Sequence, residues 1–184
     1  MIKNMADTEF LDRFEKTLEE GLVKLCSGAG LLEGEVLSST DLEEQWEKYV
    51  KDYVADAVEN FNEYPQSAIA WAGFLGMAVA NRWDRDWDLF KNDPYKSYYG
   101  SRGFDDMDEH ILNDIVKLGD ADAAKYSNAL SSCAMATLAL IRHESIEAQT
   151  AQGFYVLVRA YTVLFRIGVS LELKRLGYKK VALN

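Results

Sequence analysis

Cysteine, proline and histidine are scarce in this chain of 184 residues, which holds two of each. Two cysteines cannot supply the disulfide framework of a small secreted domain, and Cys26 and Cys133 form no Cys-x-x-Cys motif. We therefore interpret them as isolated thiols, with Cys133 as a small core residue. His110 and His143 stand in no Glu-x-x-His and no His-Asp pair, which disfavours a di-iron site and the HD phosphohydrolases.

Positive charge and long apolar runs are also limited. Lysine and arginine number 20 against 30 aspartates and glutamates, so the formal net charge is −10. Phosphate backbones and anionic membranes repel such a chain, which argues against nucleic-acid and membrane partners. The longest apolar run, Ala68–Ala80, has 13 residues and is too short to cross a bilayer. Residues 1–10 contain no apolar signal-peptide core, so we expect a cytoplasmic protein.

Most of the excess negative charge lies in the first third of the chain. Residues 1–62 hold 6 basic and 15 acidic side chains, whereas residues 63–184 hold 14 and 15. A solvated pair of helices is the common reason for such a bias, and an acidic partner-binding face is the alternative.

Helix-favouring residues dominate, and apolar residues recur at intervals of three and four. No stretch shows strand alternation, and no repeat or interdomain linker is evident. The motif Thr40-Asp-Leu-Glu43 matches a capping box and predicts a helix from about Asp41. We predict one all-α domain over residues 1–184, an antiparallel helical bundle of five to seven helices. The expected helices cover about residues 8–25, 41–61, 65–90, 106–118, 120–148 and 152–176.

The third of these helices carries a face of small residues. Ala72, Gly76 and Ala80 are spaced four apart, and Trp83 and Trp87 extend the same face at 100° per residue. The pattern predicts that another helix approaches closely over the small residues and that the tryptophans anchor the core.

Two groups of carboxylates are candidate metal ligands. Asp84 and Asp88 lie one helical turn apart, and Asp105, Asp106 and Glu109 match an Asp-Asp-x-x-Glu magnesium box. That box is typical of all-α isoprenoid synthases, but the chain is short for them and has no clear second box. The alternative is a solvated charge network with nearby cations, together with acids that suit the first turn of a helix.

A narrow polar stripe runs along the last expected helix and includes Arg159, Thr162, Arg166 and Ser170. If the stripe faces water, it is the polar face of an amphipathic helix. If it faces the bundle interior, the arginines need carboxylates or a bound anion. The candidate carboxylates are Asp84, Asp88, Glu144 and Glu147.

The loop Lys91–Phe104 is rich in tyrosine and basic residues. Disordered segments usually lack aromatic residues, so we predict an ordered loop that borders the main cleft. Tyr95, Tyr98, Tyr99 and Arg102 are its candidate binding residues, and the last three are expected to line the cleft. The alternative is that the tyrosines lie over the end of the bundle and close it.

These patterns favour a non-enzymatic protein that binds a protein partner or a small ligand without a cofactor, with a homodimer as one arrangement to test. The alternative is a magnesium-dependent hydrolase or transferase acting on a phosphorylated small molecule. Its metal ligands would come from the five carboxylates above, and Arg159 or Arg166 would hold the phosphate.

Overall fold

The computed structural model describes residues 2–146 and 150–180, with side chains from residue 8 onward in these ranges. Six α-helices and no β-strand occur there, which confirms the prediction of an all-α, single-domain helical bundle. Short 3-10 and π turns flank the fourth helix. The helices are α1 (Ile2–Gly28), α2 (Thr40–Phe61), α3 (Pro65–Phe90), α4 (Met107–His110), α5 (Asp120–His143) and α6 (Ala151–Arg175).

Local signals place most helix ends within a few residues of the prediction. The cap of α2 is one residue earlier than expected, because the Ser39 hydroxyl accepts the backbone N–H of Leu42 at 3.3 Å. Glu43 does not close the expected capping box and instead accepts hydrogen bonds from Ser38 and Arg166. α5 ends at His143, earlier than the predicted position 148.

α3 and α6 cross at the centre of the bundle, and each contributes more buried residues to its core than any other helix. The prediction of a close approach at Gly76 is confirmed: a Cβ atom there would lie 2.1 Å from the Phe165 carbonyl oxygen. Gly168 on α6 is equally tight, since its Cβ would lie 1.8 Å from the Gly73 carbonyl oxygen. Backbone therefore meets backbone at this crossing.

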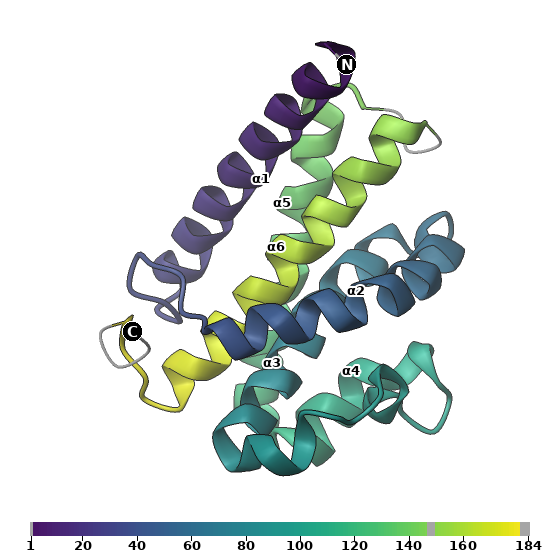
Figure 1. Ribbon diagram of the computed structural model, residues 1–184. Helices are drawn as coiled ribbons and strands as arrows, with labels where there is room; N and C mark the ends of the chain where they lie inside the picture. The colour runs from purple at the N-terminus through teal and green to yellow at the C-terminus, as the bar shows by residue number, and fades with distance from the viewer. Residues whose placement is uncertain (1, 147–149, 181–184) are drawn as a thin grey trace.

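The remaining helices surround this pair (Figure 1). Consecutive helices form antiparallel hairpins, namely α2 with α3 and α5 with α6. α1 lies alongside α6 and runs in the same direction. Two ion pairs show this: Asp12 pairs with Arg159, and Glu19 pairs with Arg166. α2 lies across α6, which thus contacts four other helices.

α6 is long and apolar enough to cross a membrane by length and composition, and 67% of its most apolar window is buried inside the bundle. A core helix of a soluble bundle has the same composition because it too is apolar nearly all round. Its burial against four other helices accounts for its sequence without a membrane.

A kink interrupts α3 near its C-terminal end. Asp86 has φ −168° and ψ 87°, outside the helical region, and its Oδ1 accepts the Leu89 N–H at 3.3 Å. The kink lies between Trp83 and Trp87 and interrupts the regular 100° spacing on which the predicted continuous face depends. Both remain half-buried against the core, and the Trp83 Nε1 donates to Asp41 at 3.2 Å.

Candidate functional site

A pocket of about 310 Å³ lies where α2 ends, α3 begins and the 3-10 turn Phe104–Asp106 packs beside them. Two other hollows, of about 410 and 390 Å³, contain at most one aromatic ring. The first pocket contains three, which makes it the better candidate for an organic ligand. Its polar and aromatic lining side chains are Asn60, Tyr64, Ser67, Trp71, Phe104 and Asp105.

The tight turn between α2 and α3 positions one wall of the pocket. The Tyr64 N–H donates to the Asn60 carbonyl at 2.8 Å, and the Asn60 side-chain amide donates to the Asp56 carbonyl at 2.8 Å. Pro65 then starts α3, since its fixed φ suits a first helical turn. The turn leaves the Tyr64 ring 58% exposed at the pocket mouth.

The inner wall consists of Trp71 and Phe104. Their rings meet edge to face with centroids 4.5 Å apart, and the buried Phe104 ring also contacts Tyr53 at 5.9 Å. These contacts fix both rings, because Tyr53 is fully buried and its hydroxyl donates to the Ala68 carbonyl at 2.5 Å. The pocket therefore has a preformed aromatic wall.

Asp105 gives the pocket its charge. It is the one carboxylate of the lining, which contains no lysine, arginine or histidine. Its side chain is exposed and forms no hydrogen bond or ion pair with any other residue that the structure describes. The lining therefore combines one unpaired carboxylate with three aromatic rings.

The loop Lys91–Phe104 contains the 3-10 turn Tyr95–Tyr98, and its end borders this pocket through Phe104, but its tyrosines do not line it. Tyr95 and Tyr99 both donate their hydroxyls to the Asp56 carboxylate on α2, the Tyr95 bond being 2.8 Å long. Burial, reinforced by Asp56, raises the pKa of both tyrosines well above the ordinary value. Both tyrosines therefore pack against α2 instead of lining the pocket.

The prediction that Tyr98 lines a cleft is wrong, because its side chain is fully buried. The Arg82 guanidinium lies 4.3 Å from the centre of its ring and pairs with Asp93 at 3.3 Å. Burial raises the pKa of Tyr98 well above the ordinary value. Sequence composition missed this because a tyrosine in a loop can point inward as easily as outward.

Arg102 and Asp106 close a turn in the loop and do not line the pocket. The Arg102 N–H donates to both Asp106 carboxylate oxygens at 3.0 and 3.1 Å, and the Ser101 hydroxyl donates at 3.1 Å. Burial would raise the pKa of Asp106, but these hydrogen bonds lower it below the ordinary value. Gly100 packs directly against this carboxylate, where a Cβ atom would lie 2.4 Å from its oxygen.

The five predicted metal ligands do not converge. Asp84 accepts the Tyr178 hydroxyl at 2.7 Å, and Asp88 pairs with Lys91 at 3.2 Å beyond the kink. The described ranges contain no group of three or more carboxylate, histidine or cysteine side chains able to hold a metal ion. The magnesium alternative, with Asp105, Asp106 and Glu109 as its second cluster, gains no support from the structure.

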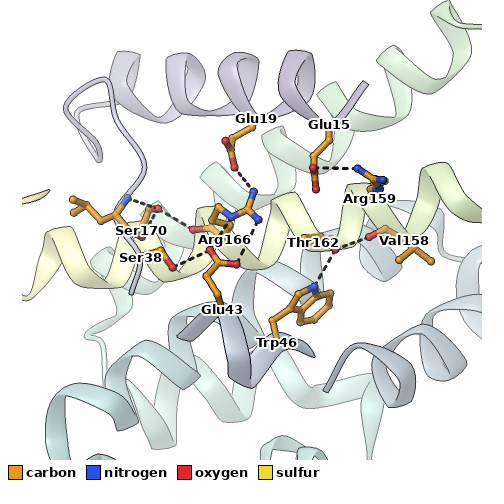
Figure 2. Close-up of polar contacts among 11 residues, drawn as sticks. Glu15, Glu19, Ser38, Glu43, Trp46, Val158, Arg159, Thr162, Arg166 and Ser170 are labelled. Carbon is orange, nitrogen blue, oxygen red and sulfur yellow. Dashed lines mark hydrogen bonds and ion pairs between the residues drawn. The ribbon is translucent and has the colours of Figure 1, made fainter. Parts of the chain in front are cut away.

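The polar stripe of α6 lies in a seam between α1 and α2, and both of its arginines already have carboxylate partners (Figure 2). Arg166 donates to Glu19 at 2.5 Å and to Glu43 at 2.9 Å. Burial would lower the pKa of Arg166, but these hydrogen bonds raise it above the ordinary value. Arg159 pairs with Asp12 at 2.7 Å and with Glu15 at 3.3 Å.

This seam corrects the expected partners of the arginines. Asp84 and Asp88 bind other side chains, Glu144 follows the last turn of α5, and Glu147 lies outside the described residues. The real partners sit on α1 and α2, far away along the chain. Four carboxylates surround the two arginines and leave the seam with an excess of negative charge, which disfavours the binding of a phosphate on this stripe.

Comparisons with protein families, curated proteins and solved structures find no match to this chain. Any function of this chain is therefore inferred from its own residues. Sequence reasoning missed Asn60, Tyr64, Ser67 and Trp71 and included Asp105 only as a metal ligand. The available signal was the Tyr64-Pro65 turn, which sets an aromatic ring just outside a helix start.

Proposed function

We propose that this protein binds a small organic cation in the pocket between the α2–α3 turn and the Phe104–Asp106 segment. The observation that carries the proposal is the pairing of three aromatic rings with one unpaired carboxylate, Asp105, in a lining free of basic side chains. The proposal develops the small-ligand binding expected from the sequence.

The physical chemistry favours a quaternary or protonated amine. An ammonium group over an aromatic face gains roughly 0.5–2 kcal/mol, depending on how far it is desolvated. Tyr64, Trp71 and Phe104 offer such faces, while Asp105 adds a full negative charge. A volume of about 310 Å³ is near the lower end of ordinary ligand pockets, so the ligand is small.

Binding explains the lining better than catalysis does. A nucleophile with an adjacent base, or two carboxylates with opposed roles, is the usual minimum for acid–base chemistry. The lining has one carboxylate and no histidine, cysteine or lysine. Asn60 and Ser67 supply polar atoms that orient a ligand.

The test compares choline with 3,3-dimethyl-1-butanol, its uncharged analogue of the same shape, by isothermal titration calorimetry. We expect saturable binding of choline that is at least about tenfold tighter than binding of the neutral alcohol, since about 1.4 kcal/mol from the charge corresponds to tenfold. Equal binding of the two compounds, or no saturation by choline at tens of millimolar, overturns the proposal.

Matched variants locate the site. Asp105→Asn and Trp71→Ala should each weaken choline binding by about tenfold or more. Tyr64→Ala should weaken it, whereas Tyr155→Ala should not, although the two rings are similarly exposed at 58% and 56%. Tyr155 lies on α6 and is not part of the pocket lining. If Tyr155→Ala has the larger effect, the ligand binds elsewhere.

A further inference from the structure

The two cysteines of the chain lie side by side in the core. Cys26 belongs to the last turns of α1 and Cys133 to the middle of α5, 107 residues apart in sequence. Their sulfur atoms are 3.6 Å apart, and both residues are 0% exposed. The two thiols are therefore in contact, which corrects the prediction that each is isolated.

The separation is close to what a disulfide needs. A disulfide bond has sulfur atoms about 2.05 Å apart, so the pair must close by about 1.5 Å. α1 and α5 pack directly against each other, so rotation of the two side chains with small helix shifts can supply this movement. Because the chain has no other cysteine, no competing thiol can exchange with the pair within the molecule.

We propose that Cys26 and Cys133 form a reversible redox site, in which a hydroperoxide oxidises the two thiols to a disulfide that joins α1 to α5. The proposal is independent of the ligand pocket. It assigns a covalent modification to two residues that otherwise serve only to fill the core.

The reaction balances with one hydroperoxide for each pair of thiols. The Cys26 thiolate attacks one peroxide oxygen, forms a sulfenic acid and releases the other oxygen as hydroxide or alkoxide, which takes up a proton. The Cys133 sulfur then attacks the Cys26 sulfur, loses its proton and displaces the sulfenic oxygen as water. Two thiols are oxidised, and the hydroperoxide is reduced to water and an alcohol, or to two waters when it is hydrogen peroxide.

The environment gives the two sulfurs different roles. The hydrogen bond between the two sulfurs, in which either atom can be the donor, lowers the pKa of Cys26, although burial opposes this. The same hydrogen bond, together with burial, raises the pKa of Cys133. The lowered pKa favours Cys26 as the attacking thiol, since the thiolate is the reactive form.

The disulfide would link α5 to α1, and α1 carries most of the carboxylates that pair with Arg159 and Arg166. Asp12, Glu15 and Glu19 all lie on α1, N-terminal to Cys26. A cross-link that closes a loop of this length restricts the unfolded chain strongly. Oxidation should therefore raise the stability of the whole bundle.

The test uses the full chain, reduced and then exposed to hydrogen peroxide. Protein unfolded in urea should take up two molecules of N-ethylmaleimide per chain before oxidation and none after it, with the intact mass lower by two hydrogens. Dithiothreitol should restore both thiols. The oxidised protein should remain monomeric on a non-reducing gel, and its Tm should rise by about 5–15 °C.

Single variants provide the control. Cys26→Ala and Cys133→Ala each leave one thiol, so neither can gain the peroxide-dependent rise in Tm. If these variants fold poorly, the thiol count and mass of the wild-type chain still decide the question. Two titratable thiols after peroxide treatment, irreversible sulfinic acid in place of a disulfide, or cross-linked dimers as the main product would each overturn the proposal.

Discussion

The two faces of α6 hold their neighbours in opposite ways. Toward α3, the contact is made by glycines: Gly168 meets Gly73, and Gly76 meets the backbone at Phe165. Toward α1 and α2, it is made by long charged side chains, chiefly Arg166, which spans from Glu19 to Glu43 (Figure 2).

The difference lies in how much each face can yield. At the glycine face the nearest atoms are backbone, so an added methyl group cannot be accommodated by moving a side chain. At the arginine face the contacts are made by the ends of long side chains, and Arg166 and Arg159 are 22% and 28% exposed. Steric fit should therefore dominate the stability of the bundle, and charge should contribute less.

The largest effect is expected from Gly76→Leu. A Cβ at Gly76 would lie 2.1 Å from the Phe165 carbonyl oxygen, so the helices must separate. We expect the free energy of unfolding in urea to fall by about 3 kcal/mol or more. The matched control is Gly21→Ala on the exposed face of α1, where nothing lies within 4 Å. Gly21→Ala should raise the free energy of unfolding by about 0.5–1 kcal/mol, because alanine favours a helix more than glycine does. A Gly76→Leu protein as stable as wild type would remove the steric half of the comparison.

Arg166→Met should have the next largest effect. It leaves Glu19 and Glu43, which are 28% and 40% exposed, without their shared cation. We expect a loss of about 1–2 kcal/mol, between the values for buried and for surface pairs. Arg159→Met should cost less than about 1 kcal/mol, because Asp12 is 64% exposed. Urea melts at low and high salt check both, since screening should shrink the two losses. The reverse ranking would contradict the seam geometry.

Tyr161→Phe tests the part of α6 that faces the tyrosines of α2. The Tyr161 hydroxyl is buried and has no hydrogen-bond partner among the described residues, so its removal should change stability by less than about 1 kcal/mol at pH 8. Burial raises the pKa of Tyr161 in the folded chain above the ordinary value of 10.0.

The raised pKa makes the effect of this variant depend on pH. The pKa of Tyr161 is higher in the folded chain than in the unfolded chain. Its contribution to the free energy of unfolding is therefore complete below about pH 10 and is lost as the pH rises from there toward the pKa of the folded chain. For each pH unit above about pH 10, the free energy of unfolding of the wild type should fall by about 1.4 kcal/mol more than that of Tyr161→Phe. Urea melts from pH 8 to pH 11 measure this difference, and parallel pH profiles for the two proteins would show that the hydroxyl is hydrated.

The smallest effect is expected from Asp84→Asn, away from both faces of α6. Asp84 accepts the Tyr178 hydroxyl at an exposed position, and an asparagine oxygen can accept the same bond. The Tm should move by less than about 2 °C, because a change below 0.5 kcal/mol corresponds to that shift in a chain of this size. A larger loss would show that Asp84 holds a buried cation that the hydrogen-bond pattern does not reveal.

Local sequence determined the helices and much of their packing surfaces. Pro65 and the apolar spacing after it predicted α3 from position 65 to 90, as observed, because a helix start and its periodicity depend on neighbouring residues. The face containing Ala72, Gly76 and Ala80 was readable for the same reason. α6 ends at Arg175, one residue before the predicted end at about 176, and Gly177 follows with φ +96°, a conformation that suits glycine after a helix.

Only the tertiary structure decided which surfaces meet. The spacing of Arg159 and Arg166 is the same whether their stripe faces water, the bundle interior or a seam between helices. The position of α1 decides among these environments. Tyr98 is buried between Arg82 and Tyr49, which lie on different helices. Cys26 and Cys133, 107 residues apart, became neighbours because α1 packs on α5. Helical periodicity records which residues share a face, whereas the partner of that face depends on the packing of the whole chain.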